Sequence, residues 1–134
     1  MRKFDMEKII IKTTKRVDLV DITEKIGSLV RKSGIKEGIC FLFCPHTTAG
    51  ITINENADPS VRHDIINVLN KLIPQDGNYA HAEGNADSHA KATLIGPSLS
   101  IFIENGELCL GSWQGVYFCE GDGPRQREVW VKII

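Results

Sequence analysis

The sequence predicts an α+β domain: a mixed, mostly antiparallel and sandwich-like β-sheet with two main helices and a short third. Strand-like segments cluster in the C-terminal half and are joined by tight turns. Two segments of the N-terminal half repeat apolar residues with the period of a helix and carry end signals. No repeat or linker divides the 134 residues, so we expect a single domain over 1–134.

The N-terminal third predicts a strand and then a helix. Residues 7–15, "EKIIIKTTK", are rich in β-branched side chains and favour a strand. Residues 21–34, "DITEKIGSLVRKSG", place apolar side chains on one helical face. Asp21 and Glu24 have the spacing of a capping box, and Gly34 is expected to end the helix.

Two strands and the second main helix follow. Residues 37–44 are apolar at almost every position, which is typical of a central strand that is buried on both faces, and residues 49–55 form a second strand. The helix begins with Asp58 as N-cap and Pro59 in its first turn, and Pro74 stops it. Its apolar stripe consists of Val61, Ile65, Val68, Leu69 and Leu72.

The C-terminal half begins with a polar loop over residues 75–88, which is long for a small domain and therefore a candidate functional loop. A short helix is expected from Ser88, as its cap, to Gly96. The pair Asn105-Gly106 predicts a type I′ hairpin. A strand over residues 113–120 and an alternating strand over residues 127–134 complete the sheet.

Composition narrows the function classes. The chain is 42% hydrophobic and 25% charged with a net charge of −1, which argues against broad binding to nucleic acid or to a membrane surface. No apolar run is long enough to span a membrane, and no signal-peptide pattern is present, so a cytoplasmic location is expected. The four cysteines are interpreted as small core residues in a reducing compartment.

Three polar clusters occur where the fold alone does not require them. The first holds His46, Thr47, Thr48, Asn54, Glu55 and Asp58; the second His81, Glu83, Asn85, Asp87, His89 and Lys91; the third Trp113, Gln114, Glu120, Asp122, Arg125 and Arg127. Imidazoles mixed with carboxylates can bind zinc or manganese, although the spacing matches no named metal signature. The same histidines could act as general acids or bases, or make only structural hydrogen bonds. His63, on the polar helix face, is expected to be a solvated surface residue.

The segment "GDGPRQR" combines glycines with two arginines. Backbone N–H groups of such turns and guanidinium groups suit phosphate oxygens, whereas a plain hairpin turn with solvated arginines is the alternative. Trp113 could stack on a heterocyclic ring or pack as a core residue.

Three motifs together resemble the YjbQ-like family, also called secondary thiamine-phosphate synthases. They are "HTTAGITINENADPSVRHD", "HAEGNADSHAKATLIGPSL" and "GELCLGSWQGVYFCEGDGPRQR", and the similarity covers the chain from about Glu7 to Ile134. The resemblance implies a homotrimer with the polar motifs in a cleft. It also implies a weak transferase activity that joins hydroxymethylpyrimidine pyrophosphate to thiazole phosphate and releases pyrophosphate.

That chemistry gives the clusters provisional roles. We predict catalytic roles for His46, His81, His89 and Asp87, and substrate or phosphate contacts for Thr47, Thr48, Asn54, Lys91, Trp113, Gln114, Arg125 and Arg127. A pyrophosphate leaving group needs positive charge and commonly a divalent metal, so zinc, magnesium or manganese is expected on His46, His81 and His89. The alternative is a metal- or anion-binding homotrimer that acts on another phosphorylated metabolite, with the synthase activity incidental.

Overall fold

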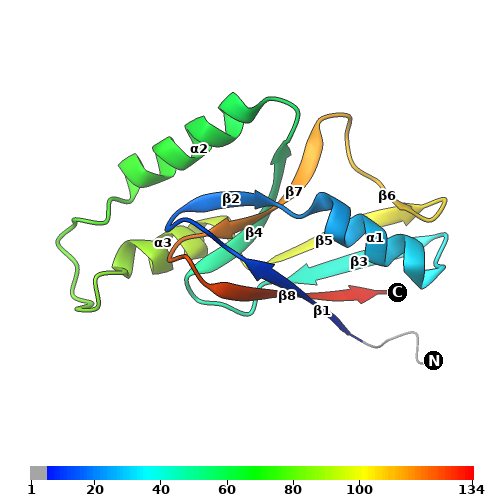
Figure 1. Ribbon diagram of the computed structural model, residues 1–134, viewed down its shortest axis with the longest axis horizontal. Coiled ribbons are helices and arrows are strands. Elements are labelled where there is room, and N and C mark those ends of the chain that lie inside the picture. The colour runs from blue at the N-terminus through cyan, green and yellow to red at the C-terminus, as the bar shows by residue number, and fades with distance from the viewer. Residues whose placement is uncertain (1–5) are drawn as a thin grey trace.

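The computed structural model describes residues 6–134 and contains two antiparallel sheets and three helices (Figure 1). In chain order the elements are β1 (Glu7–Lys12), β2 (Asp18–Asp21), α1 (Thr23–Ser33), β3 (Gly38–Phe43), β4 (Ala49–Glu55), α2 (Pro59–Leu72), α3 (Ala86–Ile95), β5 (Ser98–Glu104), β6 (Glu107–Leu108), β7 (Gln114–Glu120) and β8 (Gln126–Ile133). The predicted α+β class is therefore confirmed, with every pairing between described strands antiparallel.

The two sheets have the strand orders β1-β8-β3-β5-β6 and β2-β7-β4. Their inner faces and α1 enclose the main core, in which Phe118 of β7 and Val129 of β8 are fully buried. As predicted, β8 alternates: Val129, Val131 and Ile133 face this core. The core thus holds β7 and β8, the two strands that flank the "GDGPRQR" segment, in fixed positions.

Helix α1 begins at Thr23 with Ile22 as its N-cap, one residue after the predicted cap at Asp21, and the predicted capping box does not form. The Asp21 carboxylate accepts hydrogen bonds from the backbone N–H and the hydroxyl of Thr23, whereas Glu24 pairs with Arg31. Asp21 belongs to β2, a four-residue strand that the sequence did not predict. Gly34 ends the helix in the left-handed conformation, as expected.

Helix α2 has the predicted cap, since Asp58 accepts from the Ser60 N–H and Pro59 is its first residue. Its apolar stripe, however, is not buried: no α2 side chain is buried, and Val68 and Leu72 are 53% and 69% exposed. The helix lies over β2 at the outside of the fold (Figure 1). The helical periodicity was correct, but within one chain the helix has only a small second cluster around Leu19 to pack against.

Helix α3 begins at Ala86, two residues before the predicted cap at Ser88, and ends before Gly96 as predicted. The Ser88 hydroxyl donates instead to the Gly121 carbonyl. The hairpin between β5 and β6 turns through Asn105 and Gly106, whose φ angles of 53° and 76° confirm the type I′ turn.

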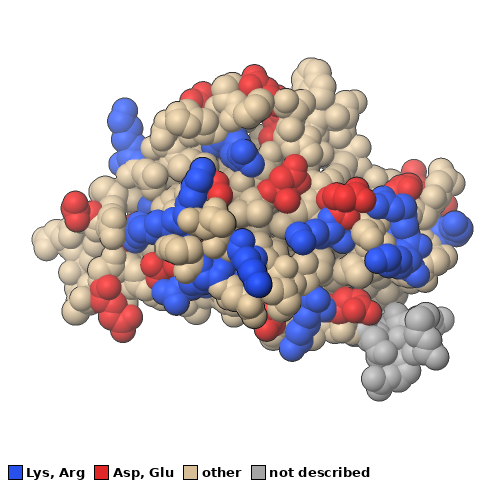
Figure 2. Space-filling view, in the orientation of Figure 1, with Lys and Arg blue, Asp and Glu red and all other residues tan. Residues whose placement is uncertain are grey.

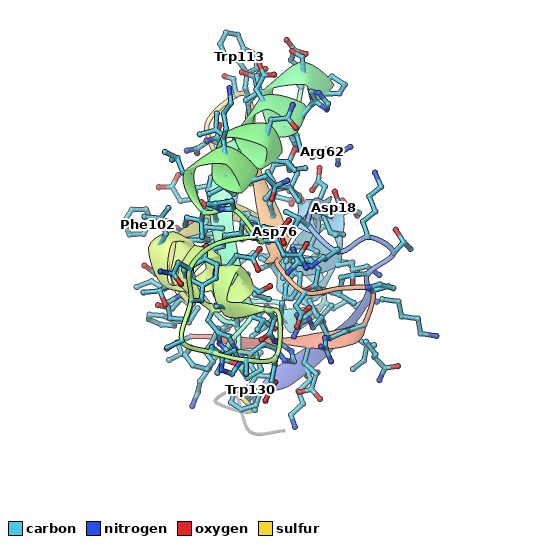
Figure 3. The ribbon with its side chains drawn as sticks, turned by 90° about the vertical axis from the view of Figure 1, so that its left-hand side faces the viewer. Asp18, Arg62, Asp76, Phe102, Trp113 and Trp130 are labelled. Atoms are coloured by element: carbon cyan, nitrogen blue, oxygen red, sulfur yellow. The ribbon has the colours of Figure 1, made fainter. Side chains whose placement is uncertain are left out.

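The five-stranded sheet leaves aromatic side chains on its outer face. Strand β3 is central, as predicted, but Phe41 and Phe43 are 43% and 44% exposed, so only one of its faces is buried in the single chain. Phe102 of β5 is 70% exposed and points away from the body in Figure 3. Nothing in the described chain covers this face.

The expectations for the cysteines and for His63 can be compared with the structure, and Cys109 is only partly buried, so it is not the core residue that was expected. Cys40, Cys44 and Cys119 are buried and all four cysteines are free thiols, and His63 is an exposed residue bonded to Asn67. Figure 2 shows Lys and Arg interspersed with Asp and Glu on the face that it draws. In the described part of the chain, no helix is long and apolar enough to cross a lipid bilayer.

Candidate functional site

A polar cleft of about 400 Å³ opens where three connections meet at one end of the sheets. Its wall comes from the β3–β4 connection, the start of α3 and the β7–β8 connection, because Ala49 pairs with Glu120 and Asn85 reaches Asp122. The lining residues are Pro45, His46, Thr47, Thr48, Glu83, Asn85, His89, Asp122, Arg125 and Arg127. Parts of all three predicted clusters therefore share one cleft.

His46 stands in this wall with one ring nitrogen already engaged. The backbone N–H of Glu128, in β8, donates to His46 Nε2 at 2.9 Å. The ring meets Phe118 edge-on with 6.4 Å between ring centroids. Burial and the nearby positive charge of Arg127 hold the pKa of His46 below its ordinary value, against an opposing effect of Glu128.

A buried ion pair between Arg127 and Glu120 lies close to His46. The guanidinium donates to both carboxylate oxygens of Glu120 and, through Nη2, to the Thr48 hydroxyl at 2.9 Å. The Thr13 hydroxyl donates to Glu120 as well, at 2.8 Å. Burial raises the pKa of Glu120, but the bonds from Arg127 and its neighbours outweigh it, so the net shift is downward. Arg127 is thereby fixed in position, and its Nη1 group has no hydrogen bond to the described protein.

Arg125 and Asp122 form the more exposed rim. The Arg125 guanidinium donates to the Asp122 carboxylate at 3.0 Å and to its carbonyl oxygen at 2.7 Å. Asn85 also donates to the Asp122 carboxylate, at 2.9 Å, and the Asn85 Oδ1 atom is buried without a partner in the described chain. These bonds join the β7–β8 connection to the start of α3.

Asp87 and Lys91 do not reach the cleft, which corrects their predicted catalytic and phosphate-binding roles. Their side chains are 0% and 3% exposed and bond to each other at 2.7 Å. Arg16, from the β1–β2 connection, clamps Asp87 with both terminal nitrogens. Burial opposes ionisation of Asp87, but its hydrogen bonds to Arg16 and Lys91 dominate and lower its pKa to about 2. These bonds tie α3 to the β1–β2 connection.

His81 and His89 are neighbours, but they do not form the predicted three-histidine metal site with His46. The two rings meet edge-on, and their centroids lie 5.3 Å apart. His89 lines the cleft, whereas His81 is not among the lining residues. The His81 Nε2 atom lies 3.8 Å from the Glu83 carboxylate. Among residues 6–134 no group of three or more His, Cys, Asp or Glu side chains is arranged to hold a metal ion. His46 Nε2 already accepts a backbone hydrogen bond. The residues of one chain therefore do not fit a metal centre.

Asn54, Trp113 and Gln114 lie far from the cleft, contrary to the expected substrate contacts. Strand β4 starts beside the cleft at Ala49 and ends at Glu55, which pairs with Gln114. Asn54 lies six residue steps along the extended chain from Thr48, a span of about 20 Å. Trp113 is 67% exposed, and Figure 3 shows it at the opposite end of the molecule from Trp130.

The structure adds supporting residues that the predicted set lacked. Thr13 donates a hydrogen bond to Glu120, and Arg16 donates to Asp87. Two further residues, Pro45 and Asn85, line the cleft. Thr13 and Arg16 come from a connection without any unusual sequence feature, so no local signal marks them. Asn85 and Asp122 were members of the polar clusters in the sequence analysis. Their position a few residues before His89 and Arg125 was the signal that could have identified them as site residues.

The cleft is rich in hydrogen-bond donors. The exposed Thr47 hydroxyl, His89 and the Nη1 groups of Arg125 and Arg127 can approach a ligand oxygen from several sides. Each arginine is already paired with a carboxylate, so the cleft supplies directed donors more than uncompensated positive charge. Such an arrangement suits the oxygens of a phosphoryl or carboxylate group.

Comparison with known proteins gives one consistent result. The family model described as UPF0047 protein YjbQ-like matches residues 7–134. A UPF0047 protein of Methanocaldococcus jannaschii is 59% identical over 92% of this chain and 90% of its own length. The UPF0047 protein YugU of Bacillus subtilis is 46% identical over 92% of this chain and 95% of its own.

Solved structures agree with the sequence relatives. A crystal structure of an uncharacterized YjbQ/UPF0047 protein from Clostridium acetobutylicum superposes with a TM-score of 0.93 at 53% identity, covering 96% of this chain and 99% of that one. A YbjQ-like protein of unknown function from Sulfolobus solfataricus gives a TM-score of 0.93 at 34% identity, over 98% and 96% of the two chains. None of these four descriptions names an activity, a substrate or a metal.

Proposed function

The chain belongs to the YjbQ-like family, and we propose that it is a transferase that binds phosphorylated heterocycles in the polar cleft. The named activity is thiamine-phosphate synthesis, the condensation of hydroxymethylpyrimidine pyrophosphate with thiazole phosphate. All four cysteines are unpaired and three of them are buried, which suits a reducing compartment, so we propose that the reaction takes place in the cytoplasm.

One observation carries the proposal: the buried Arg127–Glu120 pair fixes a guanidinium whose Nη1 group remains free at the cleft wall. A guanidinium held by three hydrogen bonds loses little side-chain freedom when it binds an anion. Arg125 and Thr47 stand on the same cleft. Together they can direct donors at the oxygens of one phosphoryl group.

In the proposed reaction a thiazole nitrogen attacks the methylene carbon of the pyrimidine substrate. A C–N bond forms, the C–O bond to pyrophosphate breaks, and pyrophosphate leaves with the bonding electron pair. No proton has to move in that step. The arginines would stabilise the negative charge that develops on the leaving oxygen, which is a role of electrostatic positioning and not of acid–base catalysis.

The test is condensation of the two precursors by purified protein, with and without Mg²⁺. Arg127→Met should lower kcat/KM at least tenfold, since one charge-assisted hydrogen bond in a protein is worth about 1.5–3 kcal/mol. Because the change also leaves Glu120 buried without its cation, circular dichroism must show that the variant is folded. Lys25→Met, at an exposed position of α1, is the matched control and should retain activity. Product formation that is unaffected by Arg127→Met, or absent from the wild-type protein, would contradict the proposal.

The cleft volume favours a second candidate function. About 400 Å³ is near the lower end of ligand sites, which suits one small phosphorylated metabolite better than two joined precursors. In this case the protein is an anion-binding homotrimer with another substrate, and the synthase reaction is incidental. Thermal-shift screening separates the two: stabilisation by other phosphorylated metabolites but by neither precursor would favour the second.

Assembly as a homotrimer is also proposed, and the uncovered sheet face supports it. Phe41, Phe43 and Phe102 form an exposed aromatic surface on β3 and β5, of the kind that marks protein interfaces. Phe41→Ser combined with Phe102→Ser should convert the oligomer to a monomer in analytical ultracentrifugation. Wild-type protein that sediments as a monomer at micromolar concentration would rule the assembly out.

A further inference from the structure

The strand β8 determines which nitrogen of His46 carries the proton. The backbone N–H of Glu128 donates to His46 Nε2 at 2.9 Å. A backbone amide can only donate, so Nε2 must present its lone pair. In a neutral imidazole the proton then lies on Nδ1.

The surroundings of the ring hold it in this form. Protonation of Nε2 would place two N–H groups head to head and leave the amide of Glu128 without an acceptor. Burial and the charge of Arg127 also lower the pKa of His46, with Glu128 and Glu120 acting in the opposite direction. The other ionisable groups near the ring are Cys44, which precedes it in the chain, and Glu83, His89, Asp122 and Arg125 across the cleft.

The second nitrogen has no protein partner. No hydrogen bond joins His46 Nδ1 to any described residue, and Nδ1 is not among the buried atoms that lack a partner. Because His46 lines the cleft, the Nδ1–H group is available to a molecule bound there. Thr47 and Arg127, which line the same wall, also offer donors.

We propose that His46 serves as a neutral N–H donor that binds an acceptor oxygen of the ligand through Nδ1, and that it neither transfers a proton nor binds a metal. The inference rests on the proposed function only for the ligand class, a phosphoryl or similar anion. A metal at Nδ1 would require the ring to lose its last proton while Nε2 accepts from Glu128. A general acid would have to surrender the same Nδ1 proton, leaving an imidazolate.

The protonation state can be measured directly on the wild-type protein. The two imidazole nitrogen shifts of His46 should be followed by ¹⁵N NMR between pH 5.5 and 8. We expect an unprotonated Nε2 and a protonated Nδ1 at neutral pH, with any imidazolium confined to pH values below the ordinary pKa of histidine. A protonated Nε2, or an imidazolium at neutral pH, would overturn the inference, and neither result depends on the substrate.

The donor role is tested with inorganic pyrophosphate as the probe. His46→Gln keeps an acceptor for the Glu128 amide and a donor for the ligand, but it can neither exchange a proton near neutral pH nor replace an imidazole on a metal. We expect pyrophosphate affinity within about threefold of wild type for His46→Gln and at least tenfold weaker for His46→Ala. His63→Gln is the matched control on α2 and should bind as wild type.

Equal losses in the Gln and Ala variants would refute the donor role. If pyrophosphate does not bind the wild-type protein at all, the proposed function fails, and the nitrogen shifts still decide the state of His46. Circular dichroism spectra of the variants distinguish lost binding from lost folding.

Discussion

Replacing Asp87 by Asn should destabilise the protein far more than removing its partner Lys91. Asp87 is fully buried and meets two cations, Arg16 and Lys91. Without the carboxylate, Lys91 remains a buried and uncompensated charge, a change that typically costs about 3–5 kcal/mol. Lys91→Met instead leaves Asp87 with the two hydrogen bonds from Arg16, so we expect a loss below about 1.5 kcal/mol.

The same carboxylate makes a definite contribution to acid stability. Its pKa falls from 3.8 to about 2 in the folded protein. This difference corresponds to about 2.5 kcal/mol in the free energy of unfolding. Because the folded pKa is the lower one, the contribution is complete above pH 4 and is lost as the pH falls toward 2. Asp87→Asn should remove this part of the acid dependence.

Urea unfolding at fixed protein concentration, from pH 7 down to pH 2.5, measures both effects. Asp76→Asn, in the exposed loop after α2, is the matched control and should change the free energy of unfolding by less than about 0.5 kcal/mol. Equal losses for Asp87→Asn and Lys91→Met would refute the reasoning. So would an Asp87→Asn protein that keeps the full acid sensitivity of wild type.

Two further predictions concern packing. Gly121→Ala would place a Cβ atom 2.7 Å from the Thr48 carbonyl oxygen, so we expect a loss of about 1–3 kcal/mol in thermal unfolding, and an unchanged melting temperature would contradict the close approach. Leu72→Ser, at a side chain that is 69% exposed, should lower the free energy of unfolding by less than about 1 kcal/mol. Leu42→Ala, in the core, should lower it by about 2–5 kcal/mol. Similar losses at both sites in urea titrations would show that α2 is buried in solution.

The elements with local end signals were predictable from the sequence. The cap at Asp58, the stop at Gly34 and the Asn105-Gly106 turn all occur as expected, because each depends on a few neighbouring residues. Strand β2 was missed because its four residues, "DLVD", are too short to show a period. The exposed α2 stripe shows the limit of periodicity, which identifies an apolar face but not what covers it.

The site was predictable only in part, because the sequence shows which polar residues are neighbours along the chain but not which of them meet in space. Antiparallel pairing of β4 with β7 brings His46, Arg125 and Arg127 to one cleft, and the start of α3 adds His89. Clustering in the sequence could not reveal that Asp87 points into the interior, since neighbouring residues of a helix face different directions. Trp113 illustrates the opposite error: it lies seven residues before Glu120, and an extended strand carries it away from the cleft.

The pairing of β1 with β8 has a consequence for synthesis on the ribosome. Glu7 pairs with Val131, and Lys12 with Gln126, so the first strand has no partner until the last one has been translated. At about 5–20 residues per second that delay is on the order of 6–25 seconds. Throughout it, the run Ile9–Ile10–Ile11 remains unpaired on the nascent chain. Arg127 lies in the same late strand, opposite Ile11. The nascent chain can therefore complete the wall of the polar cleft only after β8 has been made.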